Sequence, residues 1–373
     1  MIRPHSEAEV CEALARANSP LAVIGGGTRA IGDMQGEILD TTGLTGITHY
    51  EPAALSLVVR AGTALDEITA LLSPQRQRLG FEPPELGALL GRKGRSTIGG
   101  VAASNASGPR KVQLGSARDA MLGVRFVDGR GTAIASGGRV MKNVTGYDVV
   151  KLMAGSHGTL GVLTEISLKV QSIPEAEATL QLEGLDDTAG LATLRHALGS
   201  AYDISGAARQ GGRSYIRLEG MAGSVAYRVE KLRQGRDCTL CEGAQSAAIW
   251  QGIRDAALLH GRRGDIWRLS ILPSDAAVIV AAIVAKTRAD LLRDVVYDWA
   301  GGLVWLLLAQ GADQVVRAHV AGRGAAIKLR GAGAAPFAPQ SRDVARLSHG
   351  LKAQFDPLGR LPPLHFGPST EEK

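Results

Sequence analysis

Residues 97–119, TIGGVAASNASGPRKVQLGSARD, bring four glycines, four alanines and three serines together in a stretch without an aromatic residue. So many small side chains suit a flexible linker, a tightly packed turn, or a wall where the backbone lies against a bulky ligand. Patterns of regular structure bracket the stretch, with an apolar strand expected at 55–61 and a hairpin expected from residue 123 onward. The bracketing argues against a free linker and leaves the packed turn and the ligand wall as alternatives.

The length of 373 residues allows two domains, because a single hydrophobic core stops growing below this size. Hydrophobic residues make up 45% of the chain and charged residues 21%, as is typical of a globular protein. The formal charge is +6 and the pI is about 9.3, but no run of Lys and Arg is long enough for a polybasic patch. The composition therefore does not indicate a nucleic-acid partner, although an anionic cofactor would suit the excess of positive charge.

The longest apolar runs, at 276–285 and 303–309, are shorter than the roughly 20 residues that span a bilayer. The first residues, MIRPHSE, lack the apolar core of a signal peptide. We therefore expect no membrane span and a cytoplasmic location, or a location at a membrane through a partner.

The chain has three cysteines, Cys11, Cys238 and Cys241, and this odd number argues against a disulfide framework. The last two form a C-x-x-C pair, but no second pair and no His-x-x-x-His lies nearby in the sequence to complete a tetrahedral metal site. Ordinary thiols and no metal site are therefore expected. Since an iron–sulfur cluster usually takes four cysteines, this chain is also a poor candidate for holding one by itself.

A glycine loop follows the first expected strand. Ser6 and Glu9 form a capping box for a helix at 6–17, and a short buried strand at 21–24 then runs into Gly25-Gly26-Gly27-Thr28. A strand that ends in such a loop is typical of an anion cradle.

The same loop also matches the dinucleotide fingerprint of a Rossmann fold through Gly25, Gly27 and Ala30. That fingerprint requires a helix directly after the glycines, so that the helix N-terminus faces the pyrophosphate. Gly32 and Gly36 interrupt the next residues, and no apolar helical stripe follows them. A Rossmann fold is therefore not predicted.

Helices and strands are predicted along the rest of the chain. In the first half we expect a strand at 55–61, a helix at 65–72, a hairpin of 123–128 with 132–135, and a strand at 162–170. In the second half we expect strands near 215–218, 267–272 and 303–308 and a helix at 274–289. The sequence becomes rich in Ala and Leu after residue 173, which predicts a domain boundary there.

Several motifs of the first half occur in an ordered series. They are the glycines before Thr28, STIGGVAASNASGP at 96–109, GSARD at 115–119 and KNVTGYDVVKLMAGSHGTLGVLTEISLKV at 142–170. The series resembles the FAD-binding domain shared by vanillyl-alcohol oxidase and p-cresol methylhydroxylase (PCMH). The resemblance implies an α+β fold: a two-subdomain PCMH-type FAD-binding domain at 1–172, a smaller α+β cap-like domain at 173–335, and a C-terminal segment at 336–373 that returns to the FAD domain.

A narrower resemblance extends into the second half. Its motifs are GFEPPELG at 80–87, SGPRKVQLGSARD at 107–119, VMKNVTGYD at 140–148, IWRLSILP at 266–273 and YDWAGGLVWL at 297–306. They are similar to the FAD-binding E subunit of bacterial glycolate oxidase. The resemblance implies a FAD-dependent oxidoreductase subunit of a complex that oxidises glycolate to glyoxylate, or related 2-hydroxy acids. It also implies two partners, a second FAD-containing subunit and an iron–sulfur subunit that passes electrons onward.

The resemblance also assigns residues to the cofactor. FAD has a pyrophosphate and a flat ring system that meet the backbone directly, which large side chains would obstruct. The residues carried over for FAD binding are Gly25, Gly26, Gly27, Thr28, Thr97, Ile98, Gly99, Gly100, Ser104, Gly108, Gly158, Gly161 and Val162. Some flavoproteins of this fold bind FAD covalently through a histidine, but no histidine lies at 22–30 or 92–119, so we expect noncovalent FAD.

Oxidation of a 2-hydroxy acid requires a hydride acceptor, a base, and a cation for the carboxylate. FAD supplies the first and arginine is the usual third, but a lone histidine in a glycine loop, such as His157, is more often structural than a base. The histidines of the second half are also isolated: His196, His260, His319, His349 and His365. No catalytic residue is therefore assigned. Two alternatives remain open, a stand-alone FAD-dependent 2-hydroxy acid dehydrogenase and a flavin-fold scaffold without catalysis of its own.

Residues 351–368, LKAQFDPLGRLPPLHFGP, resemble the tail with which members of this family end. Leu361-Pro362-Pro363 stands where the family has Asn-Pro-Gly. This departure leaves open the local turn and any contact it makes with the flavin or a partner.

Overall fold

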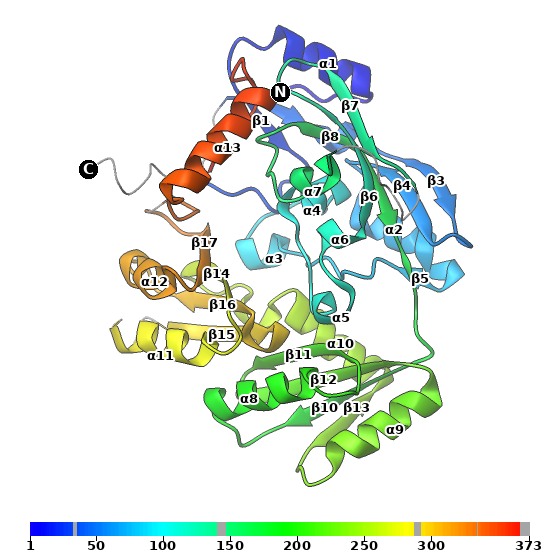
Figure 1. The fold of residues 1–373 in the computed structure, drawn as a ribbon, viewed down its shortest axis with the longest axis vertical. Helices are drawn as coiled ribbons and strands as arrows, with labels where there is room; N and C mark the ends of the chain where they lie inside the picture. Colours follow the sequence, from blue (N-terminus) through cyan, green and yellow to red (C-terminus); the bar gives the residue numbers. More distant parts are fainter. Residues whose placement is uncertain (33–35, 140–146, 287–291, 334, 366–373) are drawn as a thin grey trace.

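The computed structural model of the protein describes residues 1–32, 36–139, 147–286, 292–333 and 335–365. Figure 1 shows one sheet-based body formed by the N-terminal half of the chain and another formed by the second half, with α13 (Arg342–Phe355) back beside the first. Most of the motif at 140–148, the end of the helix expected at 274–289, and the end of the segment 336–373 lie outside the described residues.

A five-stranded antiparallel sheet forms the centre of the N-terminal half, counting the described residues. In sheet order its strands are β3 (Ile47–Glu51), β4 (Ser56–Arg60), β8 (Val162–Lys169), β6 (Met121–Val127) and β7 (Ala133–Gly137). Two smaller pairs accompany it: β1 (Leu21–Ile24) runs parallel to β2 (Glu37–Asp40), and β5 (Gln77–Arg78) runs antiparallel to β9 (Gln171–Ser172).

The core of this half lies where helices cover the sheet. β8 is the middle strand, and Leu163, Ile166 and Leu168 are buried on its two faces. Ile68 of α2 (Leu65–Leu72) and Val101 of α4 (Ile98–Ser104) pack into the same apolar cluster, so the small-residue stretch begins as a packed helix. The other helices of this half are α1 (Glu7–Arg16), α3 (Gly87–Leu90), α5 (Lys111–Leu114), α6 (Ala117–Ala120) and α7 (Val149–Met153).

An eight-stranded antiparallel sheet forms the second half in the described part of the chain. In sheet order its strands are β13 (Thr239–Glu242), β10 (Ala176–Leu182), β12 (Arg213–Gly220), β11 (Ile204–Gln210), β15 (Leu292–Asp298), β16 (Leu303–Leu308), β14 (Asp265–Ile271) and β17 (Gly324–Arg330). Four helices pack on one face: α8 (Asp187–Leu198), α9 (Ala222–Arg233), α11 (Ala276–Lys286) and α12 (Asp313–Val320). On the opposite face α10 (Gly243–Arg254) packs through Trp250.

The opposite face of the second sheet also contacts the N-terminal half. Ile266 of β14 and Trp305 of β16 pack with Leu86 and Leu89, at the start of and within α3, in one apolar cluster. Arg268 pairs in register with Trp305. Because alternate strand residues point to opposite faces, Arg268 faces the N-terminal half, as Ile266 does.

The elements expected from the sequence are present. The helices expected at 6–17 and 65–72 are α1 and α2, the hairpin is β6 with β7, and the strand expected at 303–308 is β16. The α+β class is confirmed. Between Thr28 and β2 the described residues form no helix, as expected for a chain that is not a Rossmann fold.

The C-terminal segment packs on the N-terminal half. The ring of Phe355 lies 6.0 Å from that of Phe126, and the Gly129 amide donates a hydrogen bond to the Phe355 carbonyl at 2.8 Å. Lys352 Nζ donates to the Thr159 carbonyl at 2.9 Å. Leu361 is buried in the cluster beneath α1. These contacts place residues 361–365 next to β1 and the turn before β8.

Within the described ranges, no helix is long and apolar enough to cross a membrane. Cys11, Cys238 and Cys241 are free thiols. A search of the same residues finds no group of three or more His, Cys, Asp or Glu side chains placed to hold a metal ion.

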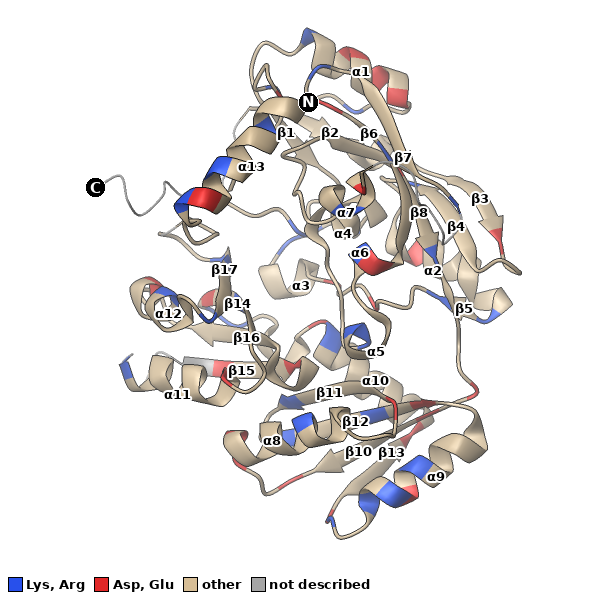
Figure 2. Ribbon diagram, in the orientation of Figure 1, with Lys and Arg blue, Asp and Glu red and all other residues tan. Residues whose placement is uncertain are grey.

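An ionic cluster joins the two halves. It consists of three arginines and three glutamates: Arg78, Glu82 and Arg110 from the N-terminal half, and Glu177, Arg217 and Glu219 from the second half. Elsewhere Lys and Arg are dispersed over many elements, as Figure 2 shows. The cluster therefore concentrates charge at the contact between the halves, where exposure to water is low.

Arg110 is the centre of this ionic cluster. Its guanidinium lies 2.6 Å from Glu82 Oε1 and 2.8 Å from Glu219 Oε2, and Arg217 Nη2 lies 2.9 Å from Glu82 Oε2. Burial alone would raise the pKa of Glu82, but the charges of Arg217 and Arg110 outweigh it and hold this pKa below its ordinary value. The same balance, with Arg110 as donor, lowers the pKa of Glu219. Both carboxylates are therefore ionised at neutral pH, and the arginines stabilise their buried negative charge.

We predict that Arg110→Met lowers the free energy of unfolding by about 3–5 kcal/mol, because it leaves buried carboxylates without their main counter-charge. The matched control is Arg213→Met, since Arg213 pairs with Glu183 at the surface and its side chain is 53% exposed. That variant should change stability far less. Urea unfolding of both variants measures the difference, and equal losses would contradict the role given to the cluster.

Candidate functional site

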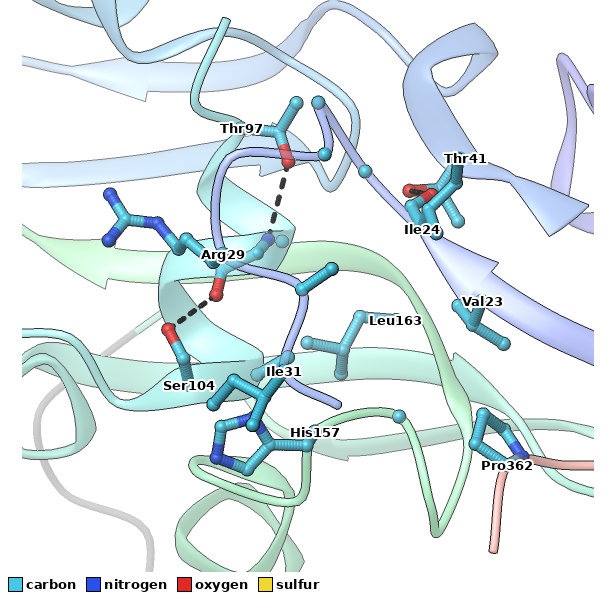
Figure 3. A pocket seen from close by; sticks show the side chains of 18 of the residues that line it. Val23, Ile24, Arg29, Ile31, Thr41, Thr97, Ser104, His157, Leu163 and Pro362 are labelled. Carbon is cyan, nitrogen blue, oxygen red and sulfur yellow. Dashed lines mark hydrogen bonds between the residues drawn. The ribbon is translucent and has the colours of Figure 1, made fainter. Parts of the chain in front are cut away.

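A cleft of about 1300 Å³, counting the part open to solvent, lies in the N-terminal half. Its walls are the loop after β1, the first turns of α4, and the turn that leads into β8. Pro362, Pro363 and His365 of the C-terminal segment close one side. Figure 3 shows the labelled side chains of these walls.

The first wall is the glycine loop at 25–31. At the end of β1, the Ile24 carbonyl accepts a hydrogen bond from Thr41 Oγ1 at 3.0 Å. The Thr28 hydroxyl lies 3.0 Å from Ser96 Oγ, and Thr28 is 3% exposed. Because this hydroxyl is engaged behind the loop, the loop presents mainly glycine backbone to the cleft.

The second wall is α4. Thr97 caps the helix by accepting a hydrogen bond from the Gly100 amide at 3.3 Å, and Ser104 Oγ donates to the Gly100 carbonyl at 2.7 Å (Figure 3). The two hydrogen bonds fix the backbone of the small-residue stretch where it borders the cleft. Both alternatives left open by the sequence are therefore present, since the stretch is tightly packed on one side and lines a cleft on the other.

The third wall is tied to the end of α4. The Gly155 amide donates to the Ala102 carbonyl at 3.1 Å, and the His157 amide donates to the Ala103 carbonyl at 2.8 Å. These bonds tie the turn at 155–158 to carbonyls in the last turn of the short helix. His157 and Gly158 both have positive φ, 52° and 78°, and this sharp turn brings them to the edge of the cleft.

The glycines of the cleft fall into two groups according to the space that an added Cβ atom would find. At Gly26 it would lie 1.6 Å from a backbone carbonyl oxygen, and at Gly99 it would lie 2.7 Å from another, so both positions are required for close packing. At Gly27 no atom lies within 4 Å of it, and at Gly100 the nearest atom lies at 3.4 Å. A side chain at Gly27 or Gly100 would therefore occupy the cleft.

Most residues that the sequence assigned to the cofactor lie together on this cleft. Those in its lining are Gly25, Gly26, Gly27, Thr28, Thr97, Gly99, Gly100, Ser104, Gly158 and Gly161. Ile98 and Val162 are instead buried in apolar clusters, where helix and strand turn them away from the lining. Gly108 lies outside it too: its carbonyl accepts a hydrogen bond from Trp299 Nε1 at 3.0 Å.

The sequence reasoning missed part of the lining. The missed residues include Arg29, Ile31, Thr41, Ala61 and Leu163. Arg29 and Ile31 follow the glycine loop directly, so their proximity to it was the available signal. Thr41 and Pro362 come from distant parts of the chain, and only the β1–β2 pairing and the return of the C-terminal segment bring them here.

Arg29 brings a buried positive charge to the cleft. Its Nη2 donates to the Pro84 carbonyl, whereas Nε and Nη1 are buried without a hydrogen-bond partner in the described residues. Burial lowers the pKa of Arg29 to about 10, so the guanidinium is still charged at neutral pH. Unpaired donors on a buried cation favour an anionic ligand.

His157 is a neutral group at physiological pH. Burial lowers its pKa to about 4, and the charges of His365 and Arg268 act in the same direction. Its ring lies 5.4 Å from that of Phe337 and 5.8 Å from that of His365, both in edge contacts. These packing contacts agree with the structural role expected for this histidine.

Comparisons with known proteins identify the family. A family model described as "FAD binding domain" matches residues 1–137. Over 350 residues the chain is 35% identical to the glycolate oxidase subunit GlcE of Escherichia coli (strain K12), with 92% of each chain covered. The chain belongs to the family of this subunit. The resemblance inferred from its motifs is thereby confirmed.

Other relatives match mainly part of this chain. D-2-hydroxyglutarate dehydrogenase, mitochondrial, of Rattus norvegicus is 32% identical over 183 residues, which cover 47% of this chain and 33% of the relative. The glycolate oxidase subunit GlcD of Bacillus subtilis (strain 168) is 36% identical over 135 residues, 36% of this chain and 27% of the relative. A solved structure of alkyldihydroxyacetonephosphate synthase has a TM-score of 0.68 at 15% identity, covering 96% of this chain and 75% of that one, which confirms the fold.

FAD is the cofactor that these findings indicate, and the cleft fits it. The open positions at Gly27 and Gly100 provide a glycine-lined cradle without side chains. The unpaired donors of Arg29 complement an anionic group. The chain is therefore a member of a FAD-linked oxidoreductase family, and the cleft that fits FAD is built from the N-terminal half and the C-terminal segment.

We predict that Gly100→Leu abolishes copurification of FAD without unfolding the protein, because Gly100 has ordinary helical backbone and its side chain would enter the cleft. The control is Gly223→Leu in α9, where an added Cβ has no atom within 4 Å and lies at the surface. Flavin absorbance per protein measures the loss, and thermal unfolding monitors the fold. A Gly100→Leu protein with a full complement of flavin would refute the placement of FAD in this cleft.

We predict that His157→Gln reduces the loss of unfolding free energy that occurs as the pH falls from 7.5 to 4.5. The lowered pKa of His157 means that the folded state binds fewer protons than the unfolded state, whose histidine titrates near 6.5. This contribution is complete above pH 6.5 and is lost as the pH falls toward 4, by about 3 kcal/mol over the window. Urea midpoints at pH 7.5 and 4.5 should differ less in the variant than in the wild type. His196→Gln, on the exposed side of α8, should leave the difference unchanged.

Proposed function

We propose that this chain is the FAD-binding subunit of a glycolate oxidase (2-hydroxy acid dehydrogenase) complex. In this complex it supports oxidation of glycolate to glyoxylate with electron transfer through flavin and a partner iron–sulfur subunit. The observation that carries the proposal is the similarity to GlcE along nearly the whole chain, combined with a cleft that retains the glycine cradle. A second FAD-containing subunit is the other expected partner, and a relative named glycolate oxidase subunit GlcD shares part of this sequence.

The proposal assigns cofactor binding, but not proton abstraction, to the cleft. When bound, FAD supplies the hydride acceptor for the reaction. The cofactor-binding residues we propose are those of the lining, Gly25, Gly26, Gly27, Thr28, Thr97, Gly99, Gly100, Ser104, Gly158 and Gly161, together with Arg29. Among the described lining residues none carries a carboxylate, and His157 is buried and packed against other rings. A base from the partner flavin subunit is therefore part of the proposal.

We infer that FAD binds without a covalent bond. The loop at 25–31 and α4 contain neither histidine nor cysteine. Two histidines, His157 and His365, do border the cleft, but their rings pack against each other and against Phe337. Such packing holds the ring nitrogens away from the role of a covalent ligand.

The division of the chain at 1–172, 173–335 and 336–373 is also proposed. It is supported by the two sheets, which use strands up to Ser172 and from Ala176 onward, and by the contacts of α13 with the first sheet. The free thiols of all three cysteines support a cytoplasmic location. Association with a membrane would then depend on the partner subunits.

A stand-alone dehydrogenase is the second candidate. The observation in its favour is the similarity of part of the chain, 47% and 43% of it, to a D-2-hydroxyglutarate dehydrogenase and a D-lactate dehydrogenase. Those relatives are aligned over only about a third of their length, 33% and 32%. The remaining two thirds of each relative are not matched to this chain in that alignment. The absence of a carboxylate from the described cleft lining also counts against this candidate.

We predict that the full chain purified alone shows a flavin spectrum that persists when glycolate is added without oxygen. The reason is that the described lining of the cleft has no carboxylate to accept the hydroxyl proton, and its two histidines, His157 and His365, pack against other rings. Addition of the second flavin subunit and the iron–sulfur subunit should allow the colour to bleach and a dye to be reduced. Acid precipitation of the same sample should leave a colourless pellet, as noncovalent binding requires.

Three outcomes would separate the alternatives. A protein without flavin would contradict the proposed function itself. Bleaching of the isolated chain by glycolate would favour the stand-alone dehydrogenase. Full activity of a complex that contains the Gly100→Leu chain without flavin would favour a scaffold instead.

A further inference from the structure

Three sequence motifs whose roles the FAD site does not explain meet at the contact between the halves. IWRLSILP supplies Arg268 on β14, YDWAGGLVWL supplies Trp299 and Trp305, and SGPRKVQLG supplies Lys111 at the start of α5. Lys111 Nζ lies 3.9 Å from the centre of the Trp299 ring. The Arg268 guanidinium carbon lies 6.0 Å from the same centre and 6.0 Å from that of Trp305. Two cations therefore lie over the ring of Trp299, and one of them also lies over the ring of Trp305.

Trp299 is fixed in this position by both halves. Its backbone amide donates to Asp298 Oδ1 at 2.7 Å, and its indole Nε1 donates to the Gly108 carbonyl at 3.0 Å. Trp299 and Ala300 have φ values of 53° and 52°, a backbone conformation that is strained for residues with a side chain. Such strain persists only where the surroundings enforce it, and it concentrates at ligand-binding positions.

The two cations lack a counter-charge of their own. Within the described ranges no carboxylate forms an ion pair with Arg268 or Lys111, and Arg268 Nη1 donates a hydrogen bond to Ser270 Oγ at 3.2 Å. Burial lowers the pKa of Arg268 to about 10, and burial together with Arg268 lowers that of Lys111. Two carboxyl groups, Asp119 and Asp298, act on Lys111 without forming an ion pair with it, and burial raises the pKa of Asp298 itself to about 7. Every arginine of the ionic cluster, by contrast, has a glutamate partner.

The cation pair adjoins the cofactor cleft. Ile31 lines the cleft and also belongs to the apolar cluster that contains Trp299 and Trp305. Arg268 is near enough to His157, on the third wall of the cleft, for its charge to act on that ring. Arg268 keeps part of its surface accessible to solvent, on the face of the second sheet that contacts the N-terminal half.

We propose that Arg268 and Lys111, held against Trp299, bind the carboxylate of a small 2-hydroxy acid at the contact between the halves, beside the flavin cleft. The planar fork of Arg268 matches a carboxylate, and Lys111 adds a second charge from the other half. An anion there supplies the counter-charge that the described residues do not. The choice of a 2-hydroxy acid as the ligand rests on the proposed function. The prediction that the cation pair binds an anion rests on the structure alone.

The test is a calorimetric titration of the full, FAD-loaded chain with glycolate. Arg268→Met and Lys111→Met should each weaken binding by about 10-fold to 100-fold, the effect of losing one charge-assisted hydrogen bond. Glycolamide, the uncharged analogue of glycolate, should not bind. Arg213→Met, which removes a surface arginine from β12, should bind glycolate as the wild type does.

A stability measurement separates binding from a structural role. If Arg268 serves an external anion, Arg268→Met should keep or raise the melting temperature without ligand, because it removes an uncompensated buried charge. A lower melting temperature with unchanged glycolate affinity would overturn the proposal. So would a wild-type chain that holds FAD but binds no glycolate, or one that binds inorganic phosphate as tightly as glycolate. A chain without FAD would instead count against the proposed function, and the titration would still report on the cation pair.

Discussion

The buried ionic cluster centred on Arg110 is the interaction on which the arrangement of the two halves depends. Each half contributes both signs of charge, so neither half can bury its share alone without a large desolvation cost. Arg110 lies next to Lys111 in the sequence and close to Gly108, whose carbonyl accepts a hydrogen bond from the Trp299 indole. The ionic contact therefore lies next to the hydrogen bond that holds Trp299 of the second half against the N-terminal half.

The glycines of the cleft have two different physical roles, although the sequence presents them as one motif. Gly26 and Gly99 allow neighbouring backbone to approach, and a larger residue there would damage the fold before it affected a ligand. Gly27 and Gly100 border open space, so a side chain at either position would enter the cleft, and the φ of 70° at Gly27 is a further reason for glycine there. This distinction needs coordinates, because both groups carry the same residue in the same loop and helix.

The sequence was informative where structure is local. The capping box of α1 and the apolar run of β16 predicted their elements closely, since capping and burial act over a few residues. The glycine motifs located the cleft through a family resemblance. Sequence periodicity could not show that Ile98 is absent from the cleft lining, because its neighbours Thr97 and Gly99 do line the cleft. Pairings across long separations were not accessible: Glu82 with Arg217, and Thr41 with the end of β1, depend on the tertiary fold.

Buried arginines that have a carboxylate partner stabilise the fold, whereas buried arginines without one are candidates for binding an anionic ligand. In the ionic cluster each arginine meets a carboxylate, and the pKa of Glu82 is lowered as expected for a satisfied pair. Arg29 and Arg268 are buried without such partners, and burial lowers the pKa of both. A folded chain tolerates such charges at a cost in stability, which binding of an anion would offset. Arg29 lines the cofactor cleft, and Arg268 on β14 is near enough to His157 of that lining for its charge to act on the ring, so the two arginines without an ion-pair partner indicate where two anionic ligands are expected.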